Sequence, residues 1–238
     1  MDATNRIFAC LEALDAAERP LSMRDLHEQV GCPLSSLALT LRSLVQLGYL
    51  HHDRSRRTYT PTVQLADLGG WVASRFAPGS AVVEAAQAIH RATGNNVAIA
   101  HRNDLRLQYI HFIPGKNLEP SVRVGTTRLL CRSGLGWALM TFLTPSAIQS
   151  VVRRTNATLP SEDRVDLEPL LAMIEKCRSN GYIRGDNMQR AGYSVLAMPF
   201  KTMKTEMVIG VSDLTERIAQ KQAQTVALMR KELDKVSG

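Results

Sequence analysis

Residues 31–50 read GCPLSSLALTLRSLVQLGYL, and this stretch decides the fold of the first part of the chain. Pro33 suits the first turn of a helix, and Gly48 suits the position just after its end. One face of this helix is apolar, because leucines recur at helical spacing at Leu37, Leu41, Leu44 and Leu47. The opposite face carries small polar residues and one arginine, Arg42. The stretch therefore predicts an amphipathic helix whose outer face is available to a partner.

The residues before this stretch predict two further helices. Ser22 and Asp25 are spaced as a capping box, and the helix that they start ends at Gly31. An earlier helix, ending before Pro20, is indicated by the apolar residues Ile7, Phe8, Leu11 and Leu14. Two short helices joined by a glycine turn are typical of a helix-turn-helix. On spacing alone, a plain helical hairpin is an equally good interpretation.

The segment that follows favours the helix-turn-helix. Residues 49–61 read YLHHDRSRRTYTP, with β-formers at both ends and a polar turn at Asp53–Ser55. Three helices followed by a basic hairpin make a winged helix-turn-helix. The arginines of the tip, Arg54, Arg56 and Arg57, are suited to phosphates or to a narrow minor groove. The alternative is a hairpin tip that is merely solvated.

Composition bounds the class of protein. With 238 residues, 45% hydrophobic and 21% charged, the chain has the composition of an ordinary globular protein with room for two domains. It has no apolar run of about 18 residues and no basic leader, so we expect a cytoplasmic protein that does not enter a membrane. Its four cysteines lack zinc-site spacing, so we expect buried thiols, no metal and no cofactor.

Charge alone does not predict which part of the chain binds DNA. The net charge is +7, but the first 65 residues contain seven basic and seven acidic side chains. The whole basic excess therefore lies after residue 65. Only the local arginines of the predicted wing argue for DNA binding by the first domain.

Beyond the wing, the pattern changes to mixed α and β. Residues 62–80 predict a connecting helix, interrupted at Gly69-Gly70 and closed by residues 78–80. After it we predict helices at 81–93, 136–142, 169–180 and 214–236, and strands at 97–101, 107–112, 121–124, 193–200 and 206–212, with turns at 102–104 and 201–204. The expected division is a DNA-binding domain at 1–65, a linker helix at 66–80 and an α/β domain at 81–238, in an α+β fold class.

These pieces resemble the IclR (isocitrate lyase regulator) family of bacterial transcription factors. The resemblance rests on RPLSMRDLHEQVGCP, SSLALTLRSLVQLGYL, VGTTRLLCRSGLGWALMTFL, KCRSNGYIRGD and SVLAMPF followed by VIGVS, in that order. It implies a winged helix-turn-helix, a linker helix and a GAF-like domain that binds a small organic acid effector. It also implies a homodimer or dimer of dimers on double-stranded operator DNA of two-fold symmetry.

The resemblance assigns the recognition helix to residues 33–47. Together with the wing, it gives the expected DNA-contacting residues as Arg24, Ser35, Ser36, Ala38, Leu39, Arg42, Ser43, Arg54, Arg56 and Arg57. Family members usually carry a basic residue where this chain has Leu34 and Leu39. Sequence reading is therefore expected to depend on Arg42, on hydroxyl contacts and on apolar contact with thymine methyl groups.

The resemblance also implies an effector site. Its expected residues are Leu130, Cys131, Ser133, Gly134, Leu135, Trp137, Arg184, Asn187, Met188, Tyr193, Ser194 and Ser212. In the family, backbone N–H groups at a helix start like that of residues 133–136 bind the ligand's carboxylate. Histidine, lysine and cysteine are common where this chain has Cys131, Trp137 and Ser194. We interpret these differences as a less polar pocket for a larger, aromatic acid.

The sequence thus predicts a ligand-responsive regulator, a repressor of a catabolic operon, and not an enzyme. The effector would shift an equilibrium between two states, and the helix around Trp71 would pass the change to the winged domains. Two alternatives remain open at this stage. One is an enzyme that uses Cys131 with a histidine, and the other is a nucleic-acid-binding protein without a ligand, which binds through the basic excess outside the winged domain.

Overall fold

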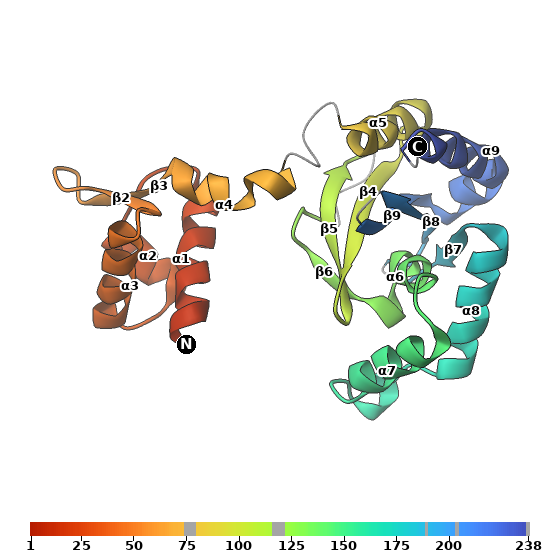
Figure 1. The fold of residues 1–238 in the computed structure, drawn as a ribbon, viewed down its shortest axis with the longest axis horizontal. Helices are drawn as coiled ribbons and strands as arrows, with labels where there is room; N and C mark the ends of the chain where they lie inside the picture. Colours follow the sequence, from red (N-terminus) through yellow and green to blue (C-terminus); the bar gives the residue numbers. More distant parts are fainter. Residues whose placement is uncertain (74–79, 116–121, 189, 203–204, 237–238) are drawn as a thin grey trace. The chain divides into compact units, whose positions relative to one another are not determined.

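The computed structural model describes residues 1–73, 80–115, 122–188, 190–202 and 205–236, drawn as a ribbon in Figure 1. The chain divides into two compact units, Met1–Arg75 and Phe76–Gly238, each of which is described by itself. Residues 74–79 of the predicted linker lie outside the described residues. The same is true of part of the predicted turn at 201–204.

The first unit is a winged helix-turn-helix. Its helices are α1 (Ala3–Ala17), α2 (Met23–Val30), α3 (Leu34–Gln46) and α4 (Val63–Ala73), and its strands are β1 (Leu21–Ser22), β2 (Leu50–Asp53) and β3 (Thr58–Pro61). The strands form an antiparallel sheet in the order β1-β3-β2. The predicted capping box is confirmed, because Ser22 Oγ accepts from the Asp25 N–H at 3.2 Å and Asp25 accepts from the Ser22 N–H at 2.8 Å.

Two residues predicted on the apolar faces are exposed instead. Phe8 is 58% exposed and Leu47 is 61% exposed. On α1 the buried stripe contains Cys10 and Leu14, and Phe8 lies about 200° around the helix from Cys10. Leu47 follows the last residue of α3, where the chain turns toward the wing. A shared core of the three helices, β1 and β2 is otherwise formed by Cys10, Leu14, Leu21, Leu26, Val30, Cys32, Leu37, Leu41, Leu44 and Leu50.

The predicted interruption of α4 at Gly69-Gly70 was wrong. The helix continues through both glycines to Ala73. A glycine inside a helix costs roughly 1 kcal/mol relative to alanine, which a helix of this length tolerates. Trp71 is part of α4, but its side chain lies outside the described residues.

The second unit is built on a six-stranded antiparallel sheet in the order β6-β5-β4-β9-β8-β7. The strands are β4 (Asn96–Asn103), β5 (Arg106–Ile113), β6 (Thr127–Leu129), β7 (Ile183–Asp186), β8 (Tyr193–Thr202) and β9 (Thr205–Leu214). Helices α5 (Ala81–Thr93) and α9 (Thr215–Asp234) cover one face, and α6 (Gly134–Met140) packs on the other (Figure 1). Two helices, α7 (Pro145–Asn156) and α8 (Leu167–Asn180), complete that second layer.

Several boundaries differ from the sequence prediction. The structure contains α7 and β7, which the pattern did not indicate. No strand covers residues 122–124, and residue 121 lies outside the described residues. The strand is β6 instead, which pairs with β5 from Arg106↔Leu129 to Gln108↔Thr127. Gly125 has φ +88°, so the chain turns there rather than remaining extended. The turn between β4 and β5 falls at 104–105 rather than 102–104.

Candidate functional site

The outer face of α3 carries most of the predicted DNA contacts. Ser35, Leu39, Arg42 and Ser43 are exposed, whereas Ser36 and Ala38 are half-buried. This face is available because the leucines of the inner face, Leu37, Leu41 and Leu44, are buried in the core of the unit. The exposed face is mixed in character, with Leu39 60% exposed next to hydroxyls and one guanidinium. Contact of this face with a major groove stays a prediction.

The wing is a pre-organised turn with a basic tip. Asp53 Oδ1 accepts hydrogen bonds from the Ser55 hydroxyl at 2.6 Å, the Ser55 N–H at 2.9 Å and the Arg56 N–H at 3.1 Å. These hydrogen bonds lower the pKa of the Asp53 carboxyl, and the bond from the Ser55 hydroxyl has the largest effect. Arg54, Arg56 and Arg57 are all exposed beyond this turn. Because Asp53 fixes the turn, the three arginines project from a defined loop.

The wing and α3 lie close together at Tyr59. The Tyr59 ring stacks on His52, with ring centroids 4.5 Å apart. Burial raises the pKa of the Tyr59 phenol, and the nearby charge of Arg42 partly offsets this effect. Arg42 of α3 is therefore next to the base of the wing.

Arg24 on α2 is exposed and pairs with Glu28 at 3.0 Å, a surface ion pair worth at most about 1 kcal/mol.

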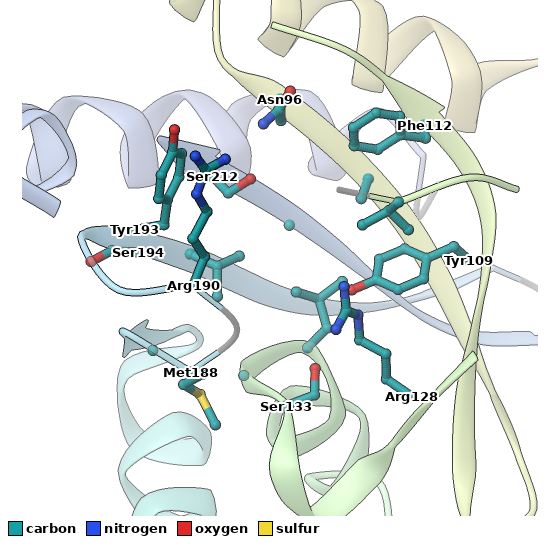
Figure 2. Close-up of a pocket in the computed structure, with 17 residues that line it drawn as sticks. Asn96, Tyr109, Phe112, Arg128, Ser133, Met188, Arg190, Tyr193, Ser194 and Ser212 are labelled. Carbon is teal, nitrogen blue, oxygen red and sulfur yellow. The ribbon is translucent and has the colours of Figure 1, made fainter. Parts of the chain in front are cut away.

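The second unit contains a cavity of about 110 Å³ on the α6 face of its sheet (Figure 2). Its walls come from the start of α6, from strands β4 to β9 and from the loop between β7 and β8. The lining residues are Asn96, Ala98, Tyr109, Phe112, Val122, Arg128, Ser133, Gly134, Leu135, Gly185, Met188, Arg190, Tyr193, Ser194, Val195, Gly210 and Ser212. None of these lining residues is acidic.

The cavity brings together seven of the twelve predicted effector-site residues: Ser133, Gly134, Leu135, Met188, Tyr193, Ser194 and Ser212. Ser133 precedes α6, which is only seven residues long, and its side chain makes no capping bond. The backbone of α6 is pressed against the sheet, because a Cβ on Gly134 would lie 3.0 Å from Val195 and one on Gly210 would lie 2.9 Å from Leu135. Glycine at these positions therefore sets the depth of the cavity.

Three predicted residues near the start of α6 do not line the cavity. Leu130 is buried in the core, and Cys131 is buried with its thiol 3.9 Å from the Thr155 hydroxyl. Trp137 donates its Nε1–H to the Cys131 carbonyl at 2.8 Å, which holds the indole away from the cavity. The short 3-10 turn formed by residues 130–132 packs against α6 and α7, and Cys131 faces Thr155 of α7.

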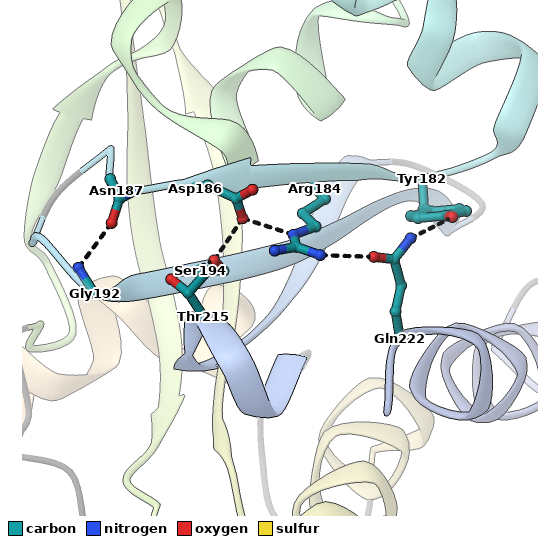
Figure 3. Close-up of polar contacts among 8 residues, drawn as sticks. All are labelled: Tyr182, Arg184, Asp186, Asn187, Gly192, Ser194, Thr215 and Gln222. Carbon is teal, nitrogen blue, oxygen red and sulfur yellow. Dashed lines mark hydrogen bonds and ion pairs between the residues drawn. The ribbon is translucent and has the colours of Figure 1, made fainter. Parts of the chain in front are cut away.

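Arg184 and Asn187 also do not line the cavity, because a polar network holds them behind its wall (Figure 3). Arg184 donates to Asp186 at 2.6 Å and to Gln222 of α9 at 3.2 Å. Asn187 accepts from the Gly192 N–H at 2.7 Å and closes the loop between β7 and β8. The network anchors the loop that carries Met188 and Arg190 into the cavity wall.

Ser194 belongs to the same network. Its hydroxyl donates to Asp186 Oδ1 at 2.5 Å and is 2.9 Å from the Thr215 hydroxyl at the start of α9. Burial raises the pKa of the Asp186 carboxyl, but the hydrogen bonds from Arg184 and Ser194 outweigh it and hold that pKa below its ordinary value. Although Ser194 contributes to the wall, its hydroxyl is therefore engaged away from the cavity (Figure 2).

Sequence reasoning missed ten lining residues, which come from all six strands, from the segment before β6 and from the β7–β8 loop: Asn96, Ala98, Tyr109, Phe112, Val122, Arg128, Gly185, Arg190, Val195 and Gly210. The alternation of β4 put Asn96 and Ala98 on one face, but the sequence did not show that α6 covers this face. Arg128 hydrogen-bonds the Tyr109 phenol, whose pKa is raised by burial and partly lowered by this arginine. No short motif marks Arg190, since it lies in an irregular loop.

Three polar groups in the cavity have donors or acceptors to offer a ligand. The Ser133 hydroxyl is buried, 1% exposed, and has no hydrogen-bond partner among the residues that the structure describes. Asn96 is 5% exposed, and its Oδ1 accepts from the Gly115 N–H at 2.7 Å, so its Nδ2 faces the cavity. The Arg190 guanidinium lies 4.7 Å from the centre of the Tyr193 ring and makes no ion pair with a described carboxylate.

The arrangement offers little to the alternative of a Cys131 nucleophile. Burial raises the pKa of the Cys131 thiol, the opposite of what an activated nucleophile needs. The hydrogen bonds of the described residues join this thiol to Thr155, not to a histidine. Within the same part of the chain, no cluster of three potential metal ligands is found.

Comparison with protein families covers both units. Residues 81–238 match the family model described as the bacterial transcriptional regulator IclR C-terminal domain. Residues 3–54 match the IclR helix-turn-helix domain. The chain belongs to the IclR family of bacterial transcriptional regulators. The α+β fold class and the winged helix-turn-helix predicted from the sequence are thereby confirmed.

Individual relatives agree with this IclR-family assignment. The chain is 22% identical over 213 residues to the HTH-type transcriptional regulator KdgR of Escherichia coli, covering 87% of this chain and 79% of that protein. The Thermotoga maritima IclR structure has a TM-score of 0.72 at 17% identity and 98% coverage of both chains. An IclR homologue from Microbacterium hydrocarbonoxydans, solved with 4-hydroxybenzoate, has a TM-score of 0.75 at 12% identity, covering 99% of this chain and 98% of its own. These structures support the fold.

None of the described helices is long and apolar enough to span a bilayer.

Proposed function

We propose that this IclR-family protein binds operator DNA through α3 and the wing and is controlled by a small organic acid bound in the cavity of the second unit. The observation that carries the proposal is the cavity itself. It lies between α6 and the sheet, and it presents Asn96 Nδ2, the Arg190 guanidinium and the Ser133 hydroxyl to whatever fills it. Among the described residues, the Ser133 hydroxyl has no hydrogen-bond partner. Ser133 and Asn96 are buried, and buried polar groups are normally hydrogen-bonded, so a ligand with matching groups would satisfy them. Arg190 is exposed and supplies a cation at the edge of the cavity.

The charge of the cavity favours an acid as the ligand. None of its described lining residues is acidic, whereas Arg190 supplies a cation that makes only a ring contact with Tyr193 among the described residues. A planar guanidinium binds a carboxylate through directed hydrogen bonds. The apolar walls, which include Phe112, Leu135 and Val195, favour a ligand with an apolar body.

The DNA-binding part of the proposal rests on the exposed faces of the first unit. All ten predicted DNA-contacting residues are on the surface or half-buried there. The wing arginines would contact phosphates, and Arg42 would read base edges next to Tyr59. The family models support the domain division that we propose, with a DNA-binding domain at 1–65, a linker helix at 66–80 and an effector-binding domain at 81–238.

In this proposal, ligand binding shifts the protein between two states that differ in operator affinity. The ligand can change DNA binding only to the extent that it binds one state more tightly than the other. Action as a repressor of a catabolic operon, assembly as a homodimer or dimer of dimers, and an aromatic effector remain predictions.

The test is fluorescence anisotropy of labelled DNA from the region upstream of the protein's own gene. We expect a preference for this DNA over a scrambled duplex, and a shift of the binding midpoint with one or more acids from a panel of benzoate, 4-hydroxybenzoate, 6-hydroxyhexanoate, hexanoate, pyruvate and glyoxylate. Equal affinity for both duplexes would instead support the alternative of a general nucleic-acid-binding protein. Preference for the upstream DNA that no acid alters would remove the effector from the proposal.

A further inference from the structure

The polar groups of the cavity lie at two separate places on its wall. Asn96, Ser212 and Arg190 are at one end, close to Tyr193, and Ser133 enters from the opposite side at the start of α6 (Figure 2). Between them the wall is apolar: Ala98 pairs with Gly210 two residues along the strands from the Asn96–Ser212 pair, and Leu135 of α6 lies against Gly210. The cavity therefore has two polar ends that are separated by an apolar middle.

The two ends differ in chemistry. The first offers the charged Arg190 guanidinium together with Asn96 Nδ2, and both have unused donors among the described residues. Such a set of donors fits a carboxylate. The second end offers the buried Ser133 hydroxyl, which both donates and accepts and so fits the hydroxyl of a ligand. Arg128 also lines this end and hydrogen-bonds the Tyr109 phenol, and an Arg128→Gln variant tests whether it holds the carboxylate instead.

We propose that the ligand is a hydroxy acid, with its carboxylate held by Asn96, Arg190 and Ser212 and its hydroxyl, at the far end of an apolar body, held by Ser133. This proposal rests on the proposed function and specifies the ligand class and its orientation. The orientation is opposite to the one implied by the family resemblance, in which the carboxylate lies at the helix start. The cavity, about 110 Å³, is of the same order as the cavity of about 150 Å³ that takes benzene, which limits the ligand to a small molecule.

The structure also supplies a matched control for Ser133. Ser194 lines the same cavity, but its hydroxyl is used by Asp186 and Thr215. Ser133→Ala and Ser194→Ala remove the same atom from the same cavity wall. Only the first removes a hydroxyl that faces the ligand in this proposal. Arg190→Gln and Arg128→Gln form a second matched pair, one at each end.

The experiment is calorimetric titration of the full chain with two matched pairs of probes, 4-hydroxybenzoate with benzoate and 6-hydroxyhexanoate with hexanoate. We expect the hydroxy acid of at least one pair to bind roughly tenfold more tightly than its partner, the scale of one hydrogen bond. Ser133→Ala should remove this preference. Ser194→Ala removes the hydrogen bond to Asp186 and should weaken both members of the pair alike, so the ratio of their affinities should be kept. Arg190→Gln should weaken both members of the pair about 10- to 100-fold, because a charge-assisted contact is lost. Circular dichroism melting of each variant identifies a loss caused by misfolding.

Three results would overturn the inference. The first is equal binding of both members of each pair, or binding of none of the four probes. The second is a hydroxyl preference that survives Ser133→Ala. The third is loss of acid binding in Arg128→Gln but not in Arg190→Gln, which would place the carboxylate at the Ser133 end. In each case the proposed function stands if pyruvate, glyoxylate or another acid still shifts DNA binding, and it fails if no acid does.

Discussion

Replacing Gly136 with alanine should destabilise the second unit, although alanine is the better helix former. Gly136 lies in α6, where it approaches the turn formed by residues 130–132 so closely that a Cβ would lie 2.2 Å from the Leu130 carbonyl oxygen and 2.6 Å from the Leu130 Cα. Both of these atoms belong to the backbone, so neither can move aside as the end of a flexible side chain does. The turn and α6 must separate to admit a methyl group.

Two opposing effects set the size of the change. Alanine in place of glycine stabilises a helix interior by about 1 kcal/mol. Forcing an extra carbon into a packed interior costs roughly 1–3 kcal/mol, and the upper end applies because the backbone itself must shift. The expected net loss is therefore about 2 kcal/mol. For a unit of this size, such a loss corresponds to a fall in Tm of roughly 4–8 °C.

The assay is differential scanning calorimetry, with Gly70→Ala as the control. Outside its own helix backbone and its two neighbours in the chain, a Cβ on Gly70 of α4 would meet no atom of the described residues within 4 Å. That substitution should raise stability by up to about 1 kcal/mol, since only the helix propensity changes. A Gly136→Ala protein that melts at or above the wild-type temperature would refute the reasoning from close packing.

Other substitutions and titrations give distinct outcomes. Arg42→Ala should abolish preference for the upstream DNA in the anisotropy assay, and unchanged specificity in this variant would contradict the proposed role of α3. Alanine at both Arg56 and Arg57 should instead weaken binding to all sequences and reduce the slope of log affinity against log salt concentration by about 2. The pKa of Asp186 is lowered in the folded protein, so its contribution to stability is present above about pH 4 and is lost as the pH falls below that value. The urea midpoints of Asp186→Asn and wild type should therefore differ at pH 6 and converge toward pH 3. A difference that stays constant with pH would exclude this origin. Burial raises the pKa of Cys177 to about 12 and that of Cys10 to about 11. Iodoacetamide at pH 8 should therefore label the four buried cysteines only after unfolding. Rapid labelling of the native protein would contradict the packing.

The sequence was sufficient for the fold wherever local patterns agree with tertiary packing. The capping box at Ser22, the glycine after α2 and the polar turn at Asp53 are local signals, and the structure contains each of them. Phe8 and Leu47 were misplaced because a periodic run of apolar residues does not show which of them face another element. Gly125 shows a similar limit, since its positive φ ends the extended segment that the pattern at 121–124 indicated.

The cavity was predictable only in part, for a physical reason. Ser133, Leu135 and Met188 lie near recognisable motifs, and they line it. Arg184 was expected there as well, but its side chain donates hydrogen bonds to Asp186 and Gln222 instead. No sequence pattern encodes the contact with Gln222, which lies 38 residues further along the chain. Asn96 and Arg190 come from a strand and an irregular loop that are far apart in the chain. Their meeting is decided by the strand order β4-β9-β8-β7, which sequence periodicity does not fix.

The central claim is that a ligand in this cavity controls binding to a specific operator. Footprinting of the DNA upstream of the protein's own gene, with and without 4-hydroxybenzoate or 6-hydroxyhexanoate, tests it most directly when wild type and Arg190→Gln are compared. The account predicts a protected site of two-fold symmetry whose half-protection concentration shifts with one of these acids in wild type and does not shift in Arg190→Gln. Protection without sequence preference, or a site in wild type that neither these two acids nor benzoate, hexanoate, pyruvate or glyoxylate shift, would contradict it.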